Sequence, residues 1–123
     1  MRTICVVGTG YVGLTTAVCF ADLGNRVTGV EIDLQKLDLL RSGRSTIYEP
    51  GLQELLERNM RAGRLTFTDD YAVALADAEL IFITVGTPMG HDGAADLSQV
   101  EAAAAGIGQH LGRDAIIIDK STV

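Results

Sequence analysis

Short apolar runs alternate with longer segments of helical periodicity along almost the whole chain. The runs are rich in β-branched residues and largely continuous, a pattern typical of strands that are buried on both faces of a parallel sheet. Five of them predict strands, over residues 3–7, 26–31, 65–68, 80–85 and 115–119.

The segments between these runs predict helices, over residues 12–23, 33–41, 52–61, 70–76 and 100–111. In the third of them, Leu or Met recurs at i, i+3, i+4 and i+8 with charged residues between, which indicates an amphipathic surface helix. Asp33 is expected to cap the second helix, and Asp96 with Gln99 to form a capping box at the start of the last.

Alternating strands and helices predict an α/β fold: a doubly wound parallel sheet with helices on both faces. The 123 residues are the length of one domain, and 47% of them are hydrophobic, which is enough for a core. We therefore expect a single domain over residues 1–123. Because the sequence stops four residues after the fifth run, we expect it to be a fragment of a longer chain.

Charge and composition exclude several classes of function. The net charge is −6 with scattered basic residues, which argues against a nucleic-acid partner. No apolar stretch approaches the roughly 20 residues that span a bilayer, and no signal peptide is evident, so we expect a cytoplasmic protein without a membrane partner. Cys5 and Cys19 lie inside apolar runs and are expected to be buried thiols. No spacing indicates a metal site.

Three glycines, Gly8, Gly10 and Gly13, stand between the first predicted strand and the first predicted helix. The G-x-G-x-x-G spacing is weak evidence alone, but this position is that of the phosphate-binding turn in Rossmann-type domains. Gly8 would allow a tight turn, Gly10 would leave room for a diphosphate, and Gly13 would let the helix approach the sheet. A turn and close packing alone would need one glycine, so the three together favour a ligand.

Glu31 stands 18 residues after Gly13 (31 − 13), at the end of the second predicted strand. A carboxylate there can accept both ribose hydroxyls of an adenosine and would repel a 2′-phosphate, which favours NAD over NADP. A solvated acid at a strand end is the alternative. Asp33 is a second candidate for the ribose, although it fits better as a cap. Lys36, in the first turn of the next helix, either serves the cofactor or is solvated.

Two further clusters follow the fourth and fifth predicted strands, the stretch TVGTP at residues 84–88 and the stretch DKSTV at residues 119–123. Ligands of open α/β sheets bind beyond the carboxyl ends of the strands, so both clusters are candidates for cofactor contacts. Ordinary turn chemistry and strand termination remain the alternatives.

The motifs GTGYVGL, VTGVEID, IYEPGL, VGTP, DGAADLS and KST, in that order, resemble the N-terminal NAD-binding domain of the UDP-glucose/GDP-mannose 6-dehydrogenase family. The resemblance covers essentially the whole chain. It implies NAD-dependent oxidation of a sugar C6 alcohol to a carboxylate, in two hydride transfers with a cysteine thiohemiacetal between them. UDP-glucose would be the substrate of the full-length protein. GDP-mannose, UDP-N-acetylmannosamine and a non-catalytic NAD-sensing role are alternatives.

The resemblance also implies roles for individual residues around the adenosine half of NAD. Tyr11 and Val12 would contact the cofactor through the glycine turn. Glu31 would hold the ribose, and Lys36 would lie alongside the adenosine end. The family often has aspartate where Glu31 stands; the longer glutamate keeps the chemistry but changes its reach.

Further along the cofactor, the resemblance implies contacts from Thr87 and Thr122, and Thr122 would also position a water near the reacting carbon. The family's nucleophilic cysteine and most of its sugar-binding residues belong to later regions without a counterpart in this sequence. Cys5 and Cys19 do not match that cysteine. We therefore expect this chain to bind NAD without turnover, and the full-length protein to be a homo-oligomer.

Overall fold

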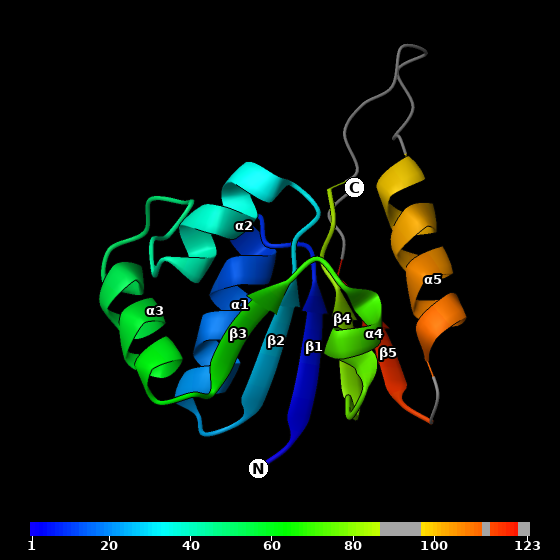
Figure 1. The fold of residues 1–123 in the computed structure, drawn as a ribbon, viewed down its shortest axis with the longest axis horizontal. Coiled ribbons are helices and arrows are strands. Elements are labelled where there is room, and N and C mark those ends of the chain that lie inside the picture. The colour runs from blue at the N-terminus through cyan, green and yellow to red at the C-terminus, as the bar shows by residue number, and fades with distance from the viewer. Residues whose placement is uncertain (87–96, 112–113, 121–123) are drawn as a thin grey trace.

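The computed structural model describes residues 1–86, 97–111 and 114–120. Within them, five parallel strands form one sheet in the order β3-β2-β1-β4-β5 (Figure 1). The strands are β1 (Thr3–Val7), β2 (Arg26–Val30), β3 (Leu65–Thr68), β4 (Leu80–Ile83) and β5 (Ile116–Asp119). β1 pairs with β2 on one side and with β4 on the other. The predicted doubly wound sheet is thus confirmed, and the order of its strands reverses beside β1.

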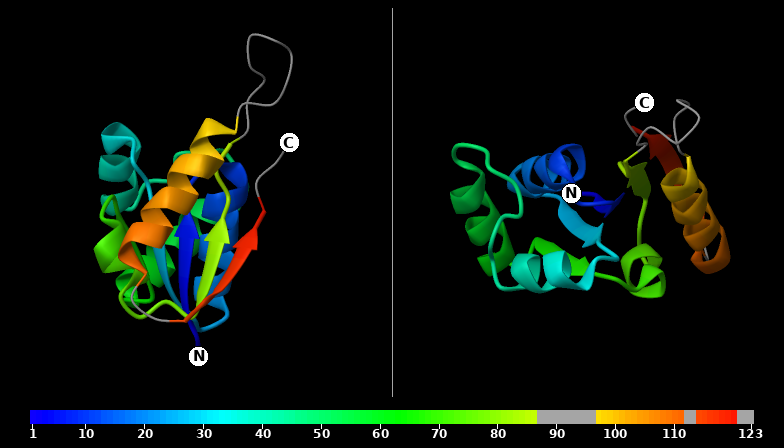
Figure 2. Two further views of the ribbon diagram at one scale, coloured as in Figure 1. Left: turned by 90° about the vertical axis from the view of Figure 1, so that its right-hand side faces the viewer. Right: turned by 90° about the horizontal axis from the view of Figure 1, so that it is seen from above.

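Helices cover both faces of this sheet (Figures 1 and 2). They are α1 (Tyr11–Asp22), α2 (Leu34–Arg41), α3 (Leu52–Arg61), α4 (Tyr71–Leu75) and α5 (Ser98–His110). Alternate residues of β1 point to opposite faces. Ile4 and Val6 pack with α1, α2 and α3, whereas Cys5 and Val7 pack with α4 and α5. No helix in the described part of the chain is long and apolar enough to cross a membrane.

Short polar side chains fix the starts of two helices. The Asp33 carboxylate accepts hydrogen bonds from the N–H groups of Gln35 (3.0 Å) and Lys36 (3.3 Å), as the sequence predicts. Asp70 accepts one from Ala72 (2.9 Å) at the start of α4. These bonds satisfy N–H groups that have no partner within the helix.

The expected capping box of α5 is wrong. Leu97 is the N-cap and Ser98 the first helical residue, so Gln99 stands at the second position rather than the third that a capping box requires. Its side-chain oxygen instead accepts a hydrogen bond from the N–H of Gly86 (3.2 Å), just after β4. Asp96 lies outside the described residues.

The expectation that both thiols are buried is right for Cys5 and wrong for Cys19. Cys5 lies in β1, fully buried, and this burial raises its pKa to about 12. Cys19 lies on α1 directly after Val18, which packs on the sheet. Because each residue turns the helix by about 100°, the side chain after Val18 points toward solvent. An apolar run therefore does not mean that the helix is buried all round.

We expect the two thiols to react at very different rates with an aromatic disulfide reagent at about pH 8, because the thiolate is the nucleophile. Cys19 reacts in the folded chain, whereas Cys5 reacts only after unfolding in urea. The absorbance of the released chromophore before and after denaturation gives the number of reactive thiols in each state. A Cys19→Ser variant should lose the fast reaction. Two fast thiols would contradict the burial of Cys5.

Candidate functional site

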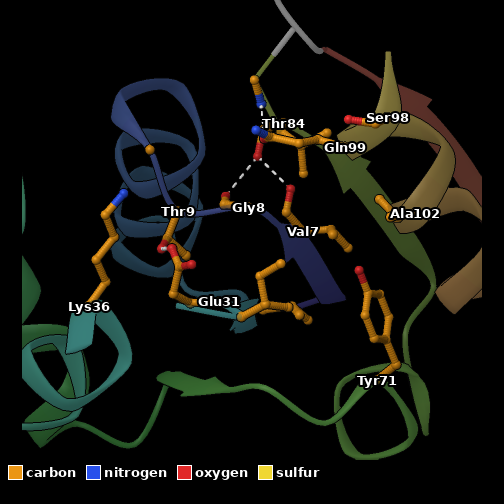
Figure 3. A pocket seen from close by; sticks show the side chains of 16 residues that line it. Val7, Gly8, Thr9, Glu31, Lys36, Tyr71, Thr84, Ser98, Gln99 and Ala102 are labelled. Carbon is orange, nitrogen blue, oxygen red and sulfur yellow. Dashed lines mark hydrogen bonds between the residues drawn. The ribbon is translucent and has the colours of Figure 1, made fainter. Parts of the chain in front are cut away.

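A cavity of about 600 Å³ opens beyond the carboxyl ends of β1, β2 and β4 (Figure 3). The three strand ends contribute Val7, Val30 and Thr84 to its lining. Tyr71 of α4 and Ala102 of α5 line it from the other side. This is the point where the strand order reverses, the usual ligand position in open α/β sheets. The volume suits a nucleotide-sized ligand.

Two of the three glycines of the G-x-G-x-x-G motif are closely packed: Gly8, in the turn between β1 and α1, and Gly13, in the first turn of α1. Gly8 has φ +95°, in the left-handed region, and a Cβ there would lie 3.1 Å from the carbonyl oxygen of Thr84. A Cβ on Gly13 would lie 1.8 Å from the carbonyl oxygen of Gly8 and 2.5 Å from Thr84 Oγ1. Gly8 thus permits the turn and Gly13 the close approach of α1, as the sequence predicts.

The third glycine, Gly10, differs because the space beside it is open. Nothing lies within 4 Å of the Cβ that a larger residue would place there, and Gly10 lines the cavity. It is also the N-cap of α1 and offers no side chain to cap the helix. The first N–H groups of α1, at the positive end of the helix dipole, therefore lie beside the cavity. Such a helix end suits a bound anion.

Thr84, the residue after β4, forms hydrogen bonds with the glycine turn. Its hydroxyl lies 2.9 Å from the carbonyl oxygens of both Val7 and Gly8 and donates to this pair. Its N–H also donates to the Val7 carbonyl at 2.9 Å, and the Gly8 N–H donates to the Val30 carbonyl at 2.9 Å. The turn is therefore held from the two strands that flank β1.

Glu31 directly follows β2, and its side chain lies at the edge of the cavity with only 8% of the residue exposed. The Thr9 hydroxyl donates a hydrogen bond to Glu31 Oε1. The Asp33 N–H donates to Oε2 at 2.9 Å. The carboxylate is thus held at both oxygens, which a solvated acid at a strand end would not be. Asp33 itself caps α2, as the sequence favours.

Lys36, the cation predicted near the cofactor, also lines the cavity (Figure 3). Tyr11, Val12 and Gly13 form the first turn of α1 and are not among the residues whose atoms line the cavity. The Tyr11 hydroxyl donates instead to the Glu49 carboxylate at 2.8 Å, and this hydrogen bond raises the pKa of Tyr11. The expected contacts of Tyr11 and Val12 with the cofactor stay predictions.

Thr87 and Thr122 lie outside the described residues, so their expected roles stay predictions. Of the stretch 84–88, Thr84, Val85 and Gly86 are described, and all three line the cavity. Within the described part of the chain, no group of His, Cys, Asp and Glu could hold a metal ion.

The lining residues that were not predicted as site residues include three with polar side chains, Thr9, Tyr71 and Gln99. Thr9 fills the variable position of the glycine motif, where the pattern specifies no side chain. Tyr71 reaches the cavity from α4, and its ring lies against Gly106 of α5, where a Cβ would be only 2.8 Å away. A hydroxyl between two glycines of the motif could have marked Thr9 as a site residue. The positions of Tyr71 and Gln99 at the cavity depend on how α4 and α5 pack, which the sequence does not show.

The sequence matches the family described as "UDP-glucose/GDP-mannose dehydrogenase family, NAD binding domain" over residues 2–123. It is 53% identical over 120 residues to a UDP-glucose 6-dehydrogenase of Pseudomonas aeruginosa, an alignment that covers 98% of this chain and 26% of that protein. A UDP-glucose dehydrogenase structure from the hyperthermophilic archaeon Pyrobaculum islandicum is similar, with a TM-score of 0.94 and 46% identity over 100% of this chain and 29% of that one.

A ternary complex of GDP-mannose dehydrogenase from Pseudomonas aeruginosa has a TM-score of 0.93 and 37% identity, covering 99% of this chain and 29% of that one. In both of these solved structures the matched part is the same fold as the chain described above. The chain spans little more than a quarter of the length of the proteins it matches.

The two glycines Gly10 and Gly13 should tolerate alanine very differently. Gly13→Ala is expected to destabilise the chain by about 3 kcal/mol or more, because the new methyl group meets backbone that cannot yield. Gly10→Ala should change stability by less than about 1 kcal/mol, since its extended backbone suits any residue and the space is open. Urea unfolding measures both. Equal losses would contradict the packing described here.

Proposed function

Because the chain belongs to the UDP-glucose/GDP-mannose dehydrogenase family as its NAD-binding domain, we propose that NAD occupies the cavity at the ends of β1, β2 and β4. Its diphosphate would lie at Gly10 and its adenosine ribose at Glu31. One observation carries this proposal: an uncovered helix N-terminus and a carboxylate held at both oxygens border the same cavity.

The residues present fit the diphosphate. A Cβ at Gly10 would occupy space that is open in the structure, and the approach to the backbone is clear only while that position has no side chain. The backbone N–H groups of Tyr11, Val12 and Gly13, at the start of α1, can then serve as donors to phosphate oxygens. This would give the three residues a binding role without any side-chain contact.

The residues also fit an adenosine ribose without a 2′-phosphate. An ionised carboxylate has about four acceptor positions, and Glu31 uses two of them for Thr9 and Asp33. The remaining positions can accept the two ribose hydroxyls. A 2′-phosphate would bring further negative charge against this acid, which favours NAD over NADP. Lys36 would lie at the adenosine end of the bound cofactor.

For the remaining predicted residues, the proposal rests on their matching the family's motifs. Thr87 would contact the cofactor beyond β4. Thr122 would contact it beyond β5 and would position a water near the reacting carbon.

For the whole protein, we propose oxidation of the C6 alcohol of a nucleotide sugar, with residues 1–123 as the NAD-binding domain. When bound, NAD supplies the acceptor for the hydride that leaves the alcohol carbon. UDP-glucose is the favoured substrate because the relative with 53% identity is a UDP-glucose 6-dehydrogenase. The sugar and the nucleophile would be held by other regions of a cytoplasmic homo-oligomer, so this chain alone would bind NAD without turnover.

Calorimetric titration of the 123-residue chain should show binding of NAD and at least about tenfold weaker binding of NADP, because the 2′-phosphate meets the Glu31 carboxylate. Gly10→Ala should keep the fold and weaken NAD binding by about tenfold as well, because the alanine methyl group enters the space of the diphosphate. Equal affinity for the two cofactors, or none for NAD, would refute the cofactor assignment.

In a full-length protein that carries this domain, NADH formation should be fastest with UDP-glucose. GDP-mannose and UDP-N-acetylmannosamine serve as the comparison substrates, and absorbance of the reduced nicotinamide measures all three. The 123-residue chain should give no NADH with any of them. Preference for another sugar would correct the substrate, and activity with none of them would argue for a sensing role.

A further inference from the structure

Thr9 joins the glycine turn to the acid that follows β2. It occupies the middle position of Gly8-Thr9-Gly10 and is only 1% exposed. Its hydroxyl donates to Glu31 Oε1 across a separation of 22 residues in the sequence. Figure 3 shows the two side chains meeting at the edge of the cavity. The parts proposed for the diphosphate and for the ribose are therefore connected by one direct hydrogen bond.

The position of the Thr9 side chain is built into the sheet. Gly29 of β2 lies opposite, and a Cβ there would be 3.3 Å from Thr9 Cγ2 and 2.8 Å from the ring of Phe67. The bare backbone at Gly29 thus leaves room for the Thr9 methyl group. A β-branched side chain has restricted χ1, and contacts on its methyl fix the direction of its hydroxyl. Thr9 is accordingly a rigid donor.

A rigid donor at Thr9 restricts the orientation of the Glu31 carboxylate. Glutamate has one more rotatable bond than aspartate, so an unheld carboxylate would sample several positions beside the cavity. The Asp33 N–H fixes Oε2 (2.9 Å), and Thr9 fixes Oε1. With both oxygens held, the loss of rotamer freedom occurs on folding rather than when a ligand arrives, which strengthens binding.

We propose that Thr9 is a positioning residue for cofactor binding and selectivity: it holds the Glu31 carboxylate in the direction that accepts the ribose hydroxyls and rejects a 2′-phosphate. This inference rests on the proposed NAD site. It predicts that Thr9 acts on the cofactor through Glu31 and not through the shape of the glycine turn.

The test is a double-mutant cycle on the 123-residue chain, with dissociation constants for NAD and NADP from calorimetry. Thr9→Val keeps the shape and removes the hydroxyl. It should weaken NAD binding by about tenfold, because a hydrogen bond to a charged group is lost. It should also reduce the ratio of the NADP dissociation constant to the NAD dissociation constant. Thr9→Ser keeps the hydroxyl and should retain most of the affinity. In a Glu31→Ala background, Thr9→Val should have no further effect.

Thr66→Val is the matched control, because Thr66 is exposed on β3 and its hydroxyl lies 3.3 Å from the Thr28 hydroxyl, away from the cavity lining. It should leave both dissociation constants unchanged. Circular dichroism checks the fold of each variant. Thr9→Ala, which removes the hydroxyl without adding an atom, takes the place of Thr9→Val if that variant does not fold.

Two results would overturn the positioning role while leaving the NAD site intact. One is an unchanged NAD affinity and selectivity in Thr9→Val while Glu31→Ala binds NAD weakly. The other is an equal loss from Thr9→Val in both backgrounds, which would mean that Thr9 shapes the turn. If Glu31→Ala binds NAD as tightly as the parent chain, the proposed ribose contact itself fails, and the role of Thr9 fails with it.

Discussion

The close approach of α1 to the end of β1 is the constraint on which the site depends. A side chain at position 13 would collide with the carbonyl of Gly8, and the Thr84 hydroxyl already occupies the remaining space. Only with glycine there can the first turn of α1 lie against the end of β1, with its N-cap Gly10 at the cavity. The position of the helix end at which we propose that the diphosphate binds is therefore a consequence of backbone packing rather than of any charged side chain.

The sheet supplies the rest of the site by bringing three strand ends together. β1 leads into the glycine turn, β2 leads to Glu31, and β4 leads to Thr84, whose hydroxyl holds the turn. Helices packed on both faces fix these strands, so groups from distant parts of the sequence keep one arrangement before a ligand binds. Preorganisation of this kind favours binding because little freedom remains to be lost.

Much of this arrangement follows from the sequence, because buried parallel strands and helix caps leave local patterns. The sequence predicts β1, the Asp33 cap and the structural roles of Gly8 and Gly13 in this way. The exposure of Cys19 was missed because an apolar run does not show which side of a helix meets solvent. The bonds of Thr9 to Glu31 and of Gln99 to Gly86 were missed because they join elements that only the tertiary fold brings together.

We propose that one cavity receives the diphosphate at Gly10 and the ribose at Glu31. Nitrogen–proton correlation NMR of the labelled chain, recorded during titration with NAD, tests it most directly. We expect the amide signals of Gly10, Tyr11 and Glu31 to shift together and to saturate at the same NAD concentration. The signals of Asn25 and Gly63, in the connections before β2 and β3, should not move. Shifts that leave Gly10 and Glu31 unmoved would contradict it.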